Sequence, residues 1–156
     1  MRCSRFLRGA VATACALVWA GWPRFVSAAD TPATDVRARN DYILHCSGCH
    51  LPDGTGNPGK GIPRFSQQVG YFLRIPEGRE FLMQVPGLLS ARLSDERAAA
   101  VMNYVIARYA AESLPVDFVP YTAEEAKRLR ETRPANIMTK RHAVYDRLVQ
   151  DGLPVQ

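Results

Sequence analysis

The sequence predicts an all-α fold for a small single domain. The strongest helix signal is a stripe of apolar residues at helical spacing within residues 95–110. The stripe consists of Ala98, Val101, Met102, Val105, Ile106 and Tyr109. A capping box opens another helix, because the threonine at 122 is followed three residues later by a glutamate. Glycine and proline gather in the segment 52–61, which is too rich in both for a helix or a strand.

The N-terminal segment, residues 1–29, has the pattern of a secretory signal peptide. Three arginines precede an apolar stretch at 9–20 that is too short to span a bilayer, and small residues follow at 26–29. We therefore expect a protein exported to the periplasm, which touches a membrane only if the signal is retained as an anchor. The rest of the chain divides into a predicted core domain over 30–112 and a C-terminal helical extension over 113–156.

The charge of the mature chain is close to zero, although the whole sequence carries a formal net charge of +5. Four of the twenty basic residues lie in the signal segment, whereas all fifteen acidic residues follow it. Removing the signal leaves sixteen basic and fifteen acidic residues, a net charge of +1. This balance gives no support for binding nucleic acid, which requires a basic surface, and we expect no nucleic-acid partner.

Residues 46–50 read Cys-Ser-Gly-Cys-His, which is the most informative motif in the chain. Two thiols at this spacing can each form a thioether with a vinyl group of a haem, and the following histidine can bind the iron. Cys46 and Cys49 are thus the predicted attachment residues for one covalent haem c, and His50 is the predicted proximal iron ligand. The alternatives are half of a zinc site, a thioredoxin-like redox pair and a disulfide. A zinc site would need two more Cys or His ligands at similar spacing. A thioredoxin-like pair would need a strand–helix–strand context, and a disulfide would leave His50 without a role.

The other elements follow from capping and turn residues. Thr34 is a suitable N-cap for a first helix over 35–44, which ends at the haem motif, and Ser94 is a suitable N-cap for the apolar-striped helix. The elements expected after the first helix are helices over 67–73, 77–84, 95–110, 123–132 and 139–150, and an extended segment over 116–121.

This order of elements resembles the class I cytochrome c family over about residues 35–110. The haem motif carries the resemblance, together with Leu-Ser-Asp-Glu at 93–96, which opens a helix that continues with Val-Met-Asn-Tyr at 101–104. The resemblance implies a class I cytochrome c-like helical domain around one covalent haem, with its first and last core helices crossing near one haem edge. The C-terminal extension resembles that of small periplasmic cytochromes associated with quinoprotein or amine dehydrogenases.

The resemblance also implies contacts around the haem. Tyr42, and either Tyr104 or Tyr109, are the implied contacts where the two helices cross. In the family a proline carbonyl accepts a hydrogen bond from the proximal histidine, and here Pro63 takes that role for His50. Such a bond fixes the tautomer and the orientation of the imidazole ring.

The distal side of the haem departs from the family pattern, which has a Met-Pro pair shortly before the last core helix. Val85 and Pro86 stand there instead, and valine cannot bind iron. Met83, two residues earlier, is the preferred sixth ligand. Its alternative role is that of an ordinary core methionine on a short helix. The other options are a vacant or water-bound position, or one of Met102, Met138 and His142.

The resemblance implies a mono-haem electron carrier rather than an enzyme. It would carry single electrons between redox partner proteins in the periplasm, from a dehydrogenase to a later cytochrome or an oxidase. With an open sixth position the protein would instead bind a small ligand, as a sensor or a weak peroxidase-like protein. A third interpretation is a fixed haem subunit of a larger dehydrogenase, docked through the tail helices.

Overall fold

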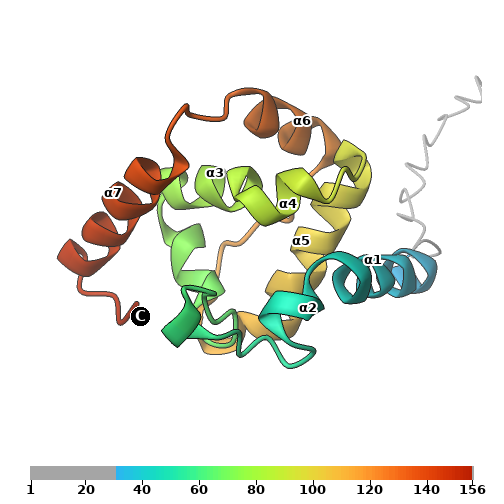
Figure 1. The fold of residues 1–156 in the computed structure, drawn as a ribbon, viewed down its shortest axis with the longest axis horizontal. Helices are drawn as coiled ribbons and strands as arrows, with labels where there is room; N and C mark the ends of the chain where they lie inside the picture. The colour runs from blue at the N-terminus through green and yellow to red at the C-terminus, as the bar shows by residue number, and fades with distance from the viewer. Residues whose placement is uncertain (1–30, 156) are drawn as a thin grey trace, which may run out of the picture.

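The structure is a computed structural model that describes residues 31–155, so the predicted signal peptide lies outside the described residues. The described residues form helices without any β-strand, which confirms the predicted all-α fold (Figure 1). The α-helices are α1 (Thr31–His45), α2 (Ser47–His50), α3 (Pro76–Gln84), α4 (Pro86–Ser90), α5 (Asp95–Tyr109), α6 (Ala123–Glu131) and α7 (Ile137–Gln150). Short 3₁₀ helices are η2 (Pro58–Lys60), η3 (Val69–Arg74) and η4 (Ala111–Ser113). Within residues 31–155, none of these helices is both long and apolar enough to cross a membrane.

Several helices differ from the expectation. The 3₁₀ helix η2 lies within the segment 52–61, which was expected to form neither helix nor strand, and α7 begins at Ile137 rather than at residue 139. α1 begins at Thr31 rather than at residue 35, because Pro32 is tolerated in a first helical turn, where its missing N–H leaves no bond unmade. The segment expected as a helix over 67–73 is the 3₁₀ helix η3. The short helix α4 was not expected, and it begins at Pro86, again in the first-turn position that suits proline.

The crossing of α1 and α5 fixes the start of the haem motif (Figure 1). Tyr42 of α1 is fully buried, with its ring centroid 5.7 Å from that of Tyr104 and 5.5 Å from that of Tyr109. Arg97 of α5 donates two hydrogen bonds to the buried carboxylate of Asp41, at 3.0 and 2.5 Å. This pairing offsets the desolvation of the carboxylate and ties the end of α1 to α5.

Helix α5 has the apolar face that the sequence predicts. The hydroxyl of Ser94 accepts a hydrogen bond from the backbone N–H of Arg97 at 3.3 Å, as an N-cap does. All six residues of the predicted stripe are buried. They belong to one continuous apolar core that extends from α1 to α7.

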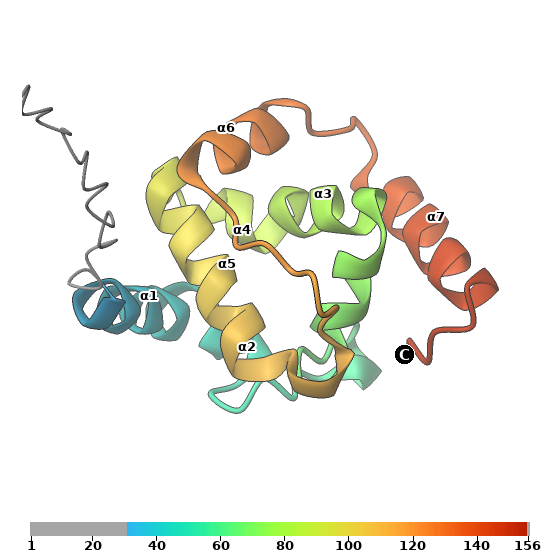
Figure 2. The same ribbon diagram turned by 180° about the vertical axis from the view of Figure 1, so that it is seen from behind.

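The C-terminal extension packs on this core. After η4 the chain runs as an extended strap, residues 114–122, across the back of the molecule to α6 (Figure 2). Helix α6 then packs against α3 and α5, and α7 packs against α3 and η3. Tyr121, Leu129 and Leu148 of the extension are buried in the same apolar cluster as the core helices.

Arg79 of α3 holds the strap and α6 in place. Its guanidinium donates two hydrogen bonds of 2.7 Å to the carboxylate of Glu125 and one of 2.8 Å to the carbonyl of Val119. The guanidinium carbon lies 4.1 Å from the ring centroid of Tyr121, whose hydroxyl donates back to the carbonyl of Arg79 at 2.7 Å. The hydrogen bonds from Arg79 lower the pKa of Glu125, so the pair is charged at neutral pH.

Gln84, at the end of α3, links the same helix to both tail helices. Its side chain is completely buried and donates a hydrogen bond to the carbonyl of Leu129 at 2.7 Å. The ammonium of Lys140 donates to the Gln84 side-chain oxygen at 2.9 Å and pairs with Glu80 at 2.8 Å. Because both the nitrogen and the oxygen of this buried amide are hydrogen-bonded, Gln84 joins α3 to α6 and to α7.

Candidate haem-attachment site

The haem motif forms a single helical turn at the end of α1. The backbone N–H groups of Cys49 and His50 both donate to the carbonyl of Cys46, at 3.1 and 2.9 Å. Residues three and four positions apart in such a turn share one face. The turn therefore presents both thiols and the imidazole in the same general direction.

Both motif cysteines are free thiols, Cys46 half-buried and Cys49 exposed. Burial raises the pKa of Cys46 to about 11, with Asp41 and Cys49 adding to the effect, so this group is a neutral thiol at pH 7. In the part of the chain that the structure describes, no group of three or more His, Cys, Asp or Glu side chains could hold a metal ion. The zinc interpretation of the motif therefore lacks its further ligands.

The ring of His50 is held on two sides. Its Nδ1 lies 3.0 Å from the carbonyl oxygen of Pro63, and its ring stacks on Phe65 with centroids 3.9 Å apart and planes 13° apart. A carbonyl can only accept a hydrogen bond, so Nδ1 carries the proton and Nε2 keeps its lone pair. Burial lowers the pKa of His50, while the bond to Pro63 acts in the opposite direction. The result favours a neutral imidazole with Nε2 free to bind iron.

These donors fit a covalent haem. Two thiols and one imidazole lie on one helical turn, and the imidazole is in the tautomer that binds a metal through Nε2. Cys46, Cys49 and His50 would hold the group, with Pro63 and Phe65 orienting the ring. The stacking of Phe65 was not predicted, and the only sequence signal for it was its place two residues after Pro63.

The loop that leaves the motif is held by two tyrosines. The hydroxyl of Tyr42 donates to the carbonyl of Leu51 at 2.5 Å, and the hydroxyl of Tyr109 donates to the carbonyl of Pro52 at 2.8 Å. Gly54 has a φ of +72° and lies against the Tyr109 ring, so a side chain there would be strained and would collide with the ring. The family resemblance implies tyrosines at the helix crossing but does not indicate their bonds to the loop.

Met83, the preferred sixth ligand, lies on α3 among core residues. It is completely enclosed by protein atoms, and Arg79, one turn earlier on the same face, points to α6. Helix α3 packs against η3, α4, α6 and α7, whereas the motif helix α2 packs against α1. Of the other options, Met102 is buried on α5, and Met138 and His142 are exposed on α7.

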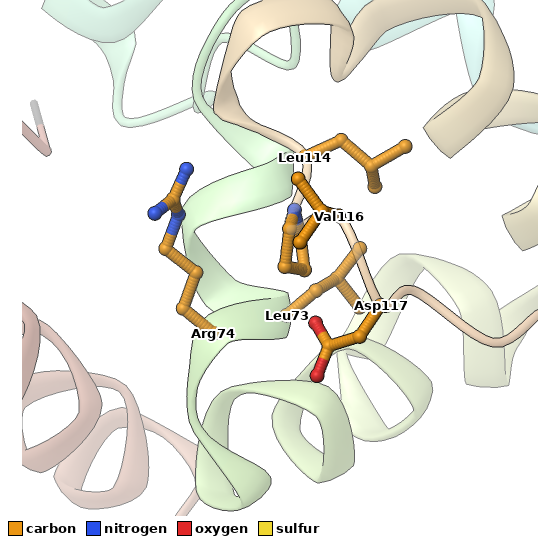
Figure 3. Close-up of a pocket in the computed structure, with 6 residues that line it drawn as sticks. Leu73, Arg74, Leu114, Val116 and Asp117 are labelled. Atoms are coloured by element: carbon orange, nitrogen blue, oxygen red, sulfur yellow. The ribbon is translucent and has the colours of Figure 1, made fainter.

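A separate pocket of about 380 Å³ lies where η3 meets the strap (Figure 3). Its lining residues are Leu73, Arg74, Leu114, Pro115, Val116 and Asp117. Arg74 donates a hydrogen bond to the carbonyl of Ser113 at 3.2 Å, which ties η3 to the start of the strap. No motif residue lines this pocket, so it is distinct from the attachment site.

Comparison with known proteins identifies relatives of the chain. No protein-family model matches it. Two curated proteins, both named cytochrome c-552 and both from Thermus thermophilus, are each 32% identical to it over 116 residues. The matched region covers 62% of this chain, and 88% of one relative and 78% of the other.

Proposed function

Because the chain belongs to the class I c-type cytochrome family, we propose that it carries single electrons between redox partner proteins. The observation that carries the proposal is the motif turn, which brings two thiols together with an imidazole whose Nε2 is free. Bound haem supplies the one-electron couple of its iron. Carriers of this kind are generally not enzymes.

The chain's own residues would hold and orient the haem. Cys46 and Cys49 would hold the macrocycle through two thioethers, and Nε2 of His50 would bind the iron. The Nδ1–H of His50 stays bonded to the Pro63 carbonyl, which keeps the ring in one tautomer and raises its basicity as a ligand. Phe65 covers one face of the ring and limits its rotation. With a thioether as the sixth ligand, little would need to move between oxidation states, which suits electron transfer.

The proposed setting is the periplasm of a bacterium, with residues 1–29 as the export signal. The donor would be a dehydrogenase, of the quinoprotein or amine type suggested by the tail, and the acceptor a later cytochrome or an oxidase. The support is the signal-like pattern of the N-terminal segment and the mature charge near zero, which suits neither nucleic acid nor an acidic membrane surface.

The sixth iron ligand separates this function from a second candidate. Met83 is the proposed ligand, since a thioether there raises the reduction potential and excludes external ligands. Met83 is fully buried in the structure. The second candidate is a haem protein whose open sixth site binds a small ligand such as carbon monoxide, and it rests on Val85, which stands where the family has the methionine of its Met-Pro pair.

Optical spectra of the holo-protein decide between the two. With Met83 ligation, the oxidised protein shows the weak far-red sulfur-to-iron band, Met83→Leu loses it, and carbon monoxide leaves the reduced wild type unchanged. With an open site, the wild type binds carbon monoxide and Met83→Leu gives the same spectra. Leucine preserves the packing volume of methionine. Met138→Leu, on the exposed face of α7, is the matched control.

A further inference from the structure

Leu51, the residue directly after His50, has a backbone conformation that leucine avoids. Its φ is 62° and its ψ is 157°, a combination that is essentially restricted to glycine. Its side chain is 42% exposed, so burial of the leucine does not account for the conformation. Strained residues of this kind persist only where the surroundings impose them, and they concentrate at functional sites.

Leu51 is also the junction between two parts of the site. Before it lies α2, which carries His50, and after it comes the loop that carries Pro63 and Phe65. Leu51 directs the chain from α2 into this loop, which a bond of 2.9 Å from the N–H of Gly56 to the carbonyl of His50 also ties to the motif. Relaxation of Leu51 is expected to displace the start of the loop relative to His50.

Hydrogen bonds on both sides hold Leu51 in this conformation. Its N–H donates to the carbonyl of Ser47 at 2.9 Å, which continues the motif turn. Its carbonyl accepts from the hydroxyl of Tyr42 at 2.5 Å and, over a longer distance of 3.1 Å, from the N–H of Gly54. The Tyr42 side chain is completely buried and packed against Phe65, Tyr104 and Tyr109, so the hydroxyl has a fixed position.

We propose that Tyr42 is a positioning residue for the iron ligand: its hydroxyl keeps Leu51 in the strained conformation that places Pro63 and Phe65 on the His50 ring. The role of His50 as iron ligand comes from the proposed function. The coupling of Tyr42 to the His50 ring through Leu51 is the new element.

A double-mutant cycle with Tyr42→Phe and Leu51→Gly tests this coupling. Glycine adopts the observed backbone angles without strain. Once Leu51 is replaced by glycine, the Tyr42 hydroxyl should therefore be less important for keeping residue 51 in this conformation. The direct measurement is the rate of solvent exchange of the His50 Nδ1 proton, followed by NMR in the reduced holo-protein. Carbon monoxide is added if the sixth site is open, so that the iron is diamagnetic. Ile106 of α5 is 1% exposed. The exchange rate of its amide proton therefore measures global unfolding of the domain.

We expect Tyr42→Phe to speed Nδ1 exchange about tenfold more than it speeds exchange at Ile106, the effect of one lost buried hydrogen bond. In the Leu51→Gly background the same substitution should have an effect below about threefold. Tyr104→Phe is the matched control, since its ring also packs on Tyr42 but, in residues 31–155, it has no bond to the loop carbonyls.

Two results would overturn the inference. One is an equal effect of Tyr42→Phe in both backgrounds, and the other is an equal change at Nδ1 and at the Ile106 amide, which would show only a general loss of stability. Failure of the proposed function would look different. The wild-type protein would then lack covalent haem altogether, whereas failure of this inference leaves the haem attached.

Discussion

Replacing both Cys46 and Cys49 with alanine is expected to give a protein without covalent haem and without a cooperative thermal transition. Among the described residues, these two are the free cysteines, and both belong to the helical turn that carries His50. A domain of this size buries a modest core by itself, and the haem adds a large apolar surface to it. Folding and haem attachment should therefore be tightly coupled.

Two measurements check this expectation. After denaturation and extraction with acidified organic solvent, haem should stay with the wild-type chain and be absent from the double variant. Calorimetry should show a cooperative transition only for the wild type. Ser47→Ala, in the same turn, removes just one exposed hydrogen bond to the carbonyl of Ile43 and should behave as the wild type. A double variant that unfolds with a transition like that of the holo-protein would refute the coupling.

Truncation after Leu114 is expected to destabilise the whole domain, because the extension contributes to the same apolar core. Tyr121, Leu129, Val144 and Leu148 are each at most 6% exposed. Burying one large apolar side chain stabilises a protein by about 1.5–3 kcal/mol, so their loss amounts to about 6 kcal/mol or more. That is comparable with the total stability of a typical domain, about 5–15 kcal/mol.

Urea unfolding of the holo-protein measures the loss. Truncation after Gln150, which removes the chain end and leaves α6 and α7 in place, is the matched control and should lower the midpoint only slightly. If the chain truncated after Leu114 keeps the wild-type midpoint and spectrum, the extension is a separate docking module. Slower electron uptake from a dehydrogenase would then be its expected defect.

The helices could be predicted because their signals are local. Ser94 and the apolar stripe define α5, and the Thr122–Glu125 capping box defines the start of α6, where the Thr122 hydroxyl accepts from the Glu125 N–H at 3.1 Å. Each of these signals involves residues within a few positions of one another. Weak or absent local signals account for the errors, as at α4, where only a proline marks the start of a five-residue helix.

The surroundings of the site could be predicted only in part, because they depend on contacts between distant segments. The thiols and imidazole follow from the motif, but the backbone strain at Leu51 depends on a hydroxyl nine residues earlier in the chain. Likewise, the burial of Met83 depends on the packing of α6 and α7 against its helix. No local pattern in residues 76–90 indicates that the tail will pack there.

A spectroelectrochemical titration of the purified holo-protein tests directly whether the protein is a one-electron carrier. We expect one reversible transition with the slope of a one-electron couple, from a single haem that stays attached to the chain throughout. The oxidised spectrum should return fully after reoxidation. A chain that is purified without covalent haem, or one whose haem is not reversibly reduced, would contradict the assignment of Cys46, Cys49 and His50 as the site of a one-electron carrier.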